Sequence, residues 1–246
     1  MERIGQKDNF IAKHAKIATV VAVIFGSTSG ILGNLITAPA LAIGFWRLAI
    51  ALPFFIIPAV ADREKRHKLK GISKKDYILC FISGAFLFGH YFSWFNAVKL
   101  TNVASASVLA ALHPLVVLLV TVFVYRRKVS LRSVLAIIVA LLGGVLIMGA
   151  DYSTFAGGNI TGNIFAFFAA VFMGLYFAMG DEVRKRVDGG LYVLMVFASC
   201  WICFIIGNIA SGTELLGYRP MDYVYLIVMA FVCQIGSHAV FNMCIG

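Results

Sequence analysis

Residues 103–125 read VASASVLAALHPLVVLLVTVFVY, a run of 23 positions without a charged side chain. The hydrocarbon core of a bilayer is about 30 Å thick, so roughly 20 apolar residues suffice for one helical crossing. The run therefore predicts a membrane-spanning helix. The whole chain is 61% hydrophobic and 13% charged, a composition typical of a protein whose solvent is lipid. We expect an all-α fold.

Seven other apolar runs of similar length accompany this one. The eight predicted spans cover residues 17–36, 40–60, 77–98, 103–125, 132–149, 161–180, 191–210 and 223–245. Because the runs recur along the whole chain, the sequence predicts a polytopic membrane helical bundle. The first run is interpreted as a retained helix and not as a signal peptide, because it is too long and another span follows at once.

Lys and Arg residues are distributed unevenly between the predicted spans. Of the 21, 18 precede the first span or follow spans 2, 4 and 6, and the other three are Arg47, Lys99 and Arg219. Cytoplasmic loops carry such an excess, so we predict a multi-pass protein of the plasma (inner) membrane with a cytoplasmic N-terminus. The net charge of +10 is thus interpreted as a topology signal, and nucleic acid is not an expected partner.

The chain also contains an internal repeat. A shift of 146 positions aligns Phe95-Asn96 with Phe241-Asn242 and spans 1–3 with spans 6–8. Five spans separate the two copies, and because five is odd the second copy enters the membrane from the other side. We expect a first repeat over residues 1–150 with five helices, and a second over residues 151–246 with three. The last two of ten helices are then missing from this sequence.

Short motifs occur in a characteristic order along the spans. They are Phe25-Gly26-Ser27-Thr28, Phe45-Trp46-Arg47-Leu48, Phe95-Asn96-Ala97-Val98, Ala104-Ser105-Ala106-Ser107 with Pro114, and Leu142-Gly143-Gly144-Val145. In order and spacing they resemble an EamA-type member of the drug/metabolite transporter superfamily. The resemblance implies ten helices in two inverted EamA repeats, cytoplasmic termini, and export of small metabolites such as amino acids. The chain departs from that pattern in its length.

Polar side chains inside the spans are candidate binding residues, because a charged group at the bilayer centre costs about 3 kcal/mol unless a cavity or partner receives it. His90 and His238 belong to two stripes of polar residues spaced three or four apart, which share a helix face. The repeat relates the spans that carry these stripes, so we expect both to face one central cavity. The alternative is that each histidine only hydrogen-bonds a neighbouring helix.

Further candidates come from the same spans. Pro114 leaves the carbonyl of Ala110 without its helical partner, so a kink is expected beside His113. Ser27 and Asn34 share a face that forms either a polar cavity wall or a close-packing surface. The predicted substrate-binding residues are His90, Trp94, His113, His238, Ser27, Asn34, Tyr176 and Gln234.

Arg47 and the aromatic candidates have two interpretations each. Arg47 lies near the outer end of its span, so we expect its side chain to snorkel to the interface; the alternative is a contact with a substrate carboxylate. The rings of Trp94, Tyr91 and Tyr176 offer a planar or cationic solute a stacking surface, or serve as core and interface anchors.

The sequence predicts a transporter that exports a small metabolite, an amino acid or similar, by alternating access. The alternatives are a proton-coupled multidrug efflux pump and a non-transporting membrane-assembly protein. No Asp or Glu lies inside a span, which disfavours the pump and leaves histidine as the only proton carrier. The expected partners are a small-molecule substrate and the lipid bilayer; a homodimer is an alternative to a monomer.

Enzymatic function is not expected. The chain contains no HExxH or GxSxG motif, and its histidines lack the acidic neighbours of a metal site. No catalytic residue, metal or cofactor is predicted. All five cysteines fall inside apolar runs, so we predict no disulfide framework.

Overall fold

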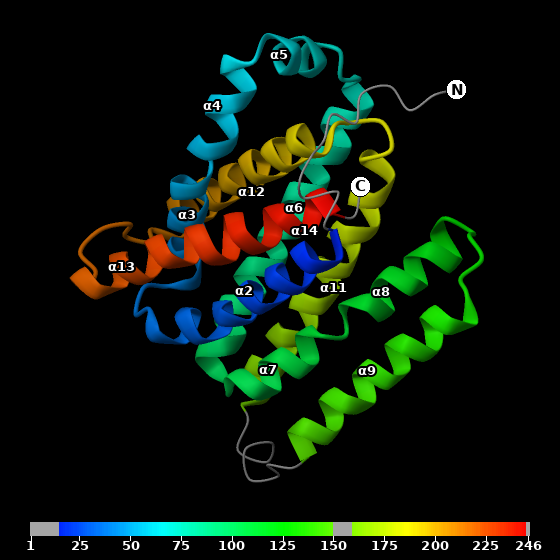
Figure 1. The fold of residues 1–246 in the computed structure, drawn as a ribbon. Helices are drawn as coiled ribbons and strands as arrows, with labels where there is room; N and C mark the ends of the chain where they lie inside the picture. Colours follow the sequence, from blue (N-terminus) through cyan, green and yellow to red (C-terminus); the bar gives the residue numbers. More distant parts are fainter. Residues whose placement is uncertain (1–14, 150–158, 245–246) are drawn as a thin grey trace.

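The computed structural model describes residues 15–149 and 159–244, and within these ranges it contains helices and no strand (Figure 1). All eight predicted spans are helical, which confirms the all-α prediction. Arg3, Lys7 and Lys13 of the basic N-terminal cluster lie outside the described residues, as does the predicted boundary between the repeats at position 150.

The first three spans comprise five helices. The helices are α2 (Ala15–Leu35), α3 (Ala40–Ala51), α4 (Pro53–Ala61), α5 (Arg63–Lys70) and α6 (Lys74–Leu100). The second predicted span is thus divided at Leu52, directly before Pro53. The short helix α5 is highly charged and connects the second span to the third, and Asp62 caps it by accepting from the backbone N–H of Glu64.

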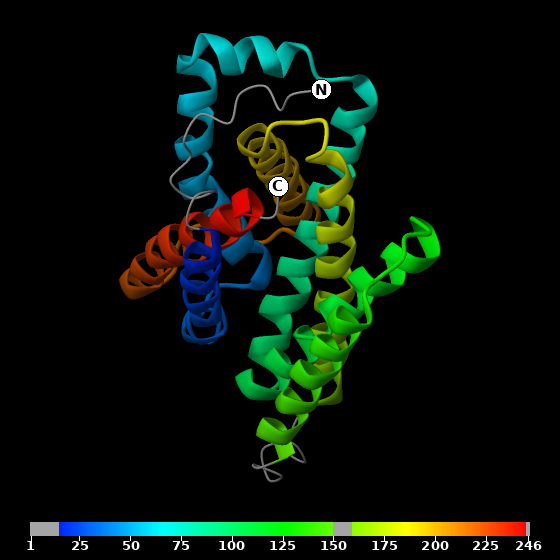
Figure 2. The same cartoon turned by 45° about the vertical axis from the view of Figure 1, so that its right-hand side comes forward.

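The next two spans form a helical hairpin. They contain α7 (Val103–Ala110), α8 (His113–Leu119), the π-helix η1 (Val120–Val124) and α9 (Leu131–Gly149). In Figure 2 the hairpin of α8 and α9 diverges from the rest of the bundle. Many of its apolar side chains are exposed, for example Phe123 and Val139, as expected for a surface that faces lipid.

The remaining three spans complete the described chain. They are α11 (Ile160–Val183), α12 (Gly189–Ser211), and a third made of α13 (Pro220–Val228), the π-helix η2 (Met229–Ala239) and α14 (Val240–Cys244). Asn159 and Asp188 cap α11 and α12, and Gly212 ends α12 in the left-handed conformation at φ +64°.

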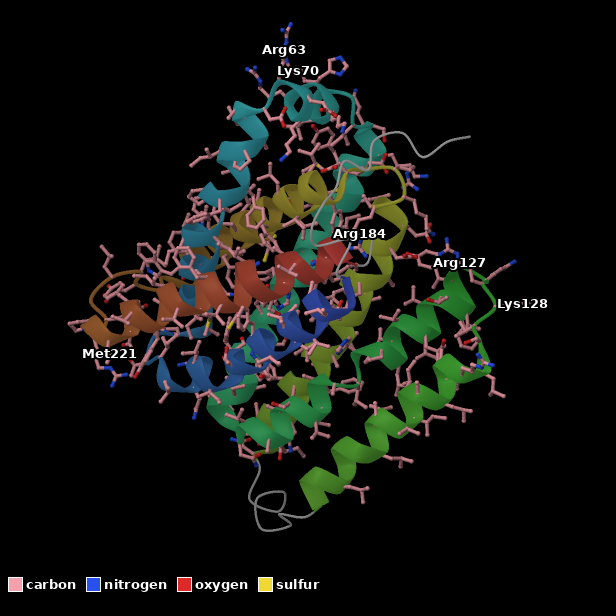
Figure 3. All side chains as sticks on the ribbon, in the orientation of Figure 1. Arg63, Lys70, Arg127, Lys128, Arg184 and Met221 are labelled. Carbon is pink, nitrogen blue, oxygen red and sulfur yellow. The ribbon has the colours of Figure 1, made fainter. Side chains whose placement is uncertain are left out.

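Seven of the eight spans are helical stretches long and apolar enough to cross a bilayer. The eighth, within α9, is a shorter apolar stretch over Leu131–Gly144. With large apolar side chains exposed along nearly every helix, the fold is a polytopic membrane helical bundle. In Figure 3 the labelled basic residues Arg63, Lys70, Arg127 and Lys128 all lie at helix ends.

The centre of the bundle is α6, which packs along α11 and α12. Gly84 allows a close approach to α12: a Cβ atom there would lie 2.8 Å from the carbonyl oxygen of Val196. At the other end of α6, a Cβ on Gly162 of α11 would lie 2.7 Å from the backbone nitrogen of Thr101. Small residues therefore bring these helices together at backbone distance, as is common between membrane helices.

Candidate functional site

A cavity of about 330 Å³ lies between α2, α3, α6, α11, η2 and the junction of α7 with α8. Five of the eight predicted site residues border it: Ser27, His90, Trp94, His113 and His238. Arg47, Tyr91 and Ser107 are further polar members of the wall, and Val23, Ala110, Ala111 and Met173 form an apolar part. None of the described residues that border the cavity is an Asp or Glu.

His90 and His238 face each other across the contact between α6 and η2. Their ring centroids are 6.2 Å apart, and the ring of Tyr91 is 5.3 Å from that of His238. His90 Nδ1 lies 2.9 Å from the carbonyl oxygen of Ala169 in α11. Because a carbonyl only accepts, Nδ1 carries the proton. His90 thus combines both sequence interpretations: it bonds a neighbouring helix and borders the cavity.

His113 lies at the break that Pro114 introduces. The helix is interrupted between Ala110 and His113, which confirms the predicted break at this position. His113 Nδ1 donates to the carbonyl oxygen of Ala110 at 3.1 Å, so the imidazole supplies the hydrogen bond that the proline ring removes. The histidine stabilises the break and borders the cavity at once.

Ser27 and Trp94 enter the cavity wall from α2 and α6. Ser27 is exposed, and its hydroxyl donates to the carbonyl oxygen of Ile24 at 2.7 Å. The indole of Trp94 lies over Gly30, where a Cβ atom would be 3.1 Å from Cζ2. The expected face of α2 is therefore divided: Gly30 packs closely, whereas Ser27 borders open space.

The remaining three predicted residues lie outside the cavity. Asn34 is exposed near the end of α2, because the helix extends past the cavity by two turns. Tyr176 is buried, and its ring lies 5.1 Å from that of Phe177. Gln234 is fully buried behind the wall, where its Oε1 accepts hydrogen bonds from Arg47 Nε at 2.6 Å and the Tyr91 hydroxyl at 2.8 Å.

Arg47 does not snorkel, which corrects the expectation from its position near a helix end. Its side chain is fully buried and borders the cavity. Besides the bond to Gln234, Nη1 donates to Ser29 Oγ at 3.4 Å, and the guanidinium carbon lies 4.4 Å from the ring centroid of Tyr91. Polar and aromatic groups of three other helices replace water around the cation, so the interface offers it no advantage.

The π-helix η2 is a feature for which we found no sequence signal. Its 11 residues carry Gln234, Ser237 and His238. A π-helix bonds i to i+5 and occurs frequently at functional sites. The wider turn alters which side chains share a face, so the α-helical spacing used for the sequence stripe describes this segment only in part.

A second arginine cluster lies outside the cavity, where α2 ends and α13 begins. Asp222 is fully buried and accepts hydrogen bonds from Arg219 Nη2 at 3.0 Å and from the backbone nitrogen of Thr37 at 3.1 Å. The Thr37 hydroxyl also donates to Asp222, and Arg219 Nη2 donates to the carbonyl oxygen of Leu35. The hydrogen bond with Asp222 raises the pKa of Arg219.

A third arginine, Arg184, is labelled in Figure 3. It borders a separate cavity of about 400 Å³ between α8, α9 and α11. Its Nη1 donates to Asn242 Oδ1 at 2.9 Å, and its guanidinium lies 5.2 Å from the ring centroid of Tyr192. Within residues 15–149 and 159–244, no three His, Cys, Asp or Glu side chains lie close enough together to hold a metal ion.

Comparisons with known proteins agree with the motifs. The model of the EamA-like transporter family matches residues 15–149. The uncharacterized transporter YxxF of Bacillus subtilis (strain 168) is 30% identical over 186 residues, which are 73% of this chain and 59% of YxxF, so the chain spans less than two thirds of that relative. A crystal structure of another protein matches with a TM-score of 0.71 at 19% identity, over 96% of this chain and 79% of that one, which shows the likeness of fold.

Proposed function

Since the chain belongs to the EamA-like transporter family of the drug/metabolite transporter superfamily, we propose that it exports a small metabolite across the plasma membrane by alternating access. The cavity beside which His90 and Tyr91 of α6 meet His238 of η2 is the observation that carries the proposal. These elements belong to the two parts of the chain expected to form inverted repeats, and transporters of that design bind their substrate at the repeat interface. The N-terminus is then cytoplasmic.

The size and lining of the cavity favour a small organic solute. A volume of about 330 Å³ is at the lower end of the range for ligand pockets. The wall combines polar groups with apolar ones, which suits a metabolite that has both a polar and an apolar part. Because the wall lacks a carboxylate, it offers no site that protons and lipophilic cations could occupy in turn, as a multidrug pump requires.

Counterflow of radiolabelled solutes into proteoliposomes that contain the full chain tests the proposal. We expect accumulation of at least one member of a panel of amino acids and small organic acids. A charged, water-soluble thiol reagent should block this flux in a Ser27→Cys variant, because position 27 borders the cavity. Ile206→Cys is the matched control: this side chain is exposed on an apolar helix, where lipid keeps the reagent away.

Two results contradict the proposal. If no solute in the panel were transported, the proposal that the chain is a transporter would be contradicted. Flux that the reagent leaves intact in Ser27→Cys, although the thiol is labelled, would place the transport path elsewhere. The unsubstituted chain measures the background from Cys203, which is half-buried, while Cys80, Cys200 and Cys233 are buried.

A further inference from the structure

Arg47 is a buried cation whose neighbours are all uncharged. Nε and Nη1 donate to the amide of Gln234 and the hydroxyl of Ser29, and the ring of Tyr91 lies against the guanidinium. Nη2 is buried and has no hydrogen-bond partner among the described residues. The side chain as a whole has no exposed surface. One of its donors is therefore left unsatisfied.

No carboxylate in the described ranges balances this charge. Each acidic residue there caps a helix, pairs with another basic residue, or lies in the exposed connection before α13. They are Asp62 and Asp188 as caps, Glu64, Asp76, Asp181, Glu182 and Asp222 in ion pairs, and Glu214 in the connection. The seven ion pairs among described residues include neither Arg47 nor any other residue that borders the cavity.

An unpaired charge at this depth is unfavourable for stability. Burying an ion without a partner costs several kcal/mol even after relaxation, and ionisable residues inside membrane spans commonly mark substrate pathways. Methionine or leucine would fill the same volume without that cost. A ligand that brings a negative charge into the cavity would supply the missing partner.

We propose that the cavity binds the carboxylate of a small organic acid or amino acid, with Arg47 as its anchor; this substrate class rests on the proposed transport function. A planar guanidinium with free donors matches a carboxylate in geometry as well as charge. One cation balances one negative charge, which selects a carboxylate over a doubly charged phosphate. Trp94, Met173 and Val23 border the same cavity and receive the apolar body of the solute.

The contacts of Arg47 also indicate how the carboxylate reaches it. The bond to Gln234 is short, at 2.6 Å, whereas the contact to Ser29 Oγ is 3.4 Å, near the limit of a hydrogen bond. A carboxylate is a stronger acceptor than a hydroxyl and displaces Ser29 with little loss. Because Arg47 has no exposed surface before binding, its guanidinium must turn toward the cavity as the solute enters.

Equilibrium binding to the purified full chain tests the anchor without requiring flux. The probes are 4-methylpentanoate and its amide, 4-methylpentanamide, which differ in charge and hardly in size, together with acetate and leucine. Hydrogen bonds to charged groups are roughly twice as strong as neutral ones, so we expect the carboxylate to bind about tenfold to hundredfold more tightly than the amide. Equal affinity for the two, or no binding of any carboxylate, would overturn the inference.

A Gln234→Glu variant provides the sharpest test, because it gives Arg47 a carboxylate of its own. Oε1 already accepts from Arg47 and Tyr91, and Nε2 of Gln234 has no partner among the described residues, so an oxygen in its place breaks no bond. We expect the preference for carboxylate over amide to disappear. Arg47→Lys keeps the charge but loses the planar guanidinium with its paired donors. It should retain part of the preference.

The control is Asn242→Asp, which places a carboxylate beside Arg184 and outside the cavity wall, at the loss of the hydrogen bond that Asn242 Nδ2 donates to the carbonyl oxygen of His238. It should keep the full preference. A loss there equal to that in Gln234→Glu would show an effect of net charge and refute the anchor. The flux assay separates the two proposals: carboxylate binding without flux contradicts transport alone, and flux of amides or amines without carboxylate preference contradicts the anchor alone.

Discussion

Arg47 and Arg219 are two arginines of one chain with opposite surroundings. Arg219 is largely exposed yet pairs with Asp222, which also accepts from the backbone and hydroxyl of Thr37. Arg47 is fully buried and has neutral partners alone. In the first pair the buried carboxylate of Asp222 has a counter-ion within the fold, whereas the buried cation of Arg47 lacks one among the described residues.

The different surroundings of the two arginines distinguish a structural role from a role in solute recognition. The ion pair of Arg219 with Asp222 joins the end of α2 to the start of α13, so its charges are satisfied within the fold. At the cavity the chain withholds the carboxylate and surrounds the guanidinium with groups that position it. An arginine side chain thus stabilises the fold at position 219 and, in the proposal, binds the solute at position 47.

The largest expected effect belongs to Arg47→Met. Removal of the cation should weaken carboxylate binding by about a hundredfold, or about 3 kcal/mol, the upper value for a hydrogen bond to a charged group. The melting temperature should stay the same or rise, because an apolar side chain replaces an unpaired buried charge. Binding and thermal unfolding measured on one preparation check both parts; a large fall in melting temperature with binding intact would make Arg47 a structural residue.

Asp222→Asn should lower stability and leave carboxylate binding unchanged, the opposite of Arg47→Met, and its effect should be smaller. The amide keeps one acceptor oxygen but forfeits the charge, leaving Thr37 and Arg219 with poorer partners. We expect the free energy of unfolding to fall by about 1–2 kcal/mol and the affinity for 4-methylpentanoate to stay unchanged. Unfolding in detergent with and without the carboxylate measures both. A tenfold loss of affinity would show that the Arg219–Asp222 cluster affects the cavity, and would contradict the distinction between a structural and a binding arginine.

The smallest effect is expected for Ser29→Ala, which removes the longest hydrogen bond of Arg47. Stability should change by about 0.5 kcal/mol or less, and carboxylate affinity should rise by about twofold, because the guanidinium no longer has to leave the hydroxyl. Ser107→Ala is the control, since this hydroxyl borders the cavity but bonds its own helix at Val103. A fall in affinity in Ser29→Ala alone would mean that Ser29 binds the solute itself.

Hydropathy predicted the helices well because their lengths follow from the thickness of the bilayer. The run over residues 103–125 is helical as expected, and Pro114 interrupts it for a reason visible in the sequence. The division of this run into α7, α8 and η1 was not predicted in detail. Nor was the role of His113 as the donor to Ala110, which depends on a side-chain rotamer.

The cavity could be predicted in part. His90 and His238 were paired through the repeat, and they lie together in the structure. The burial of Arg47 escaped prediction because depth was judged along a single helix. Its surroundings come from Tyr91 and Gln234, 44 and 187 positions away in the chain. Asn34 was proposed from a shared helix face, but a face continues beyond the cavity that it borders.

The close approach of α6 to α12 has a mechanical consequence for any transport cycle. At Gly84 the backbones lie so near that even a methyl group has no room, so the two helices cannot slide past each other without collision. In the proposed transport cycle this seam, which joins the earlier and later parts of the chain, stays fixed. The opening and closing movements must then occur between elements other than α6 and α12.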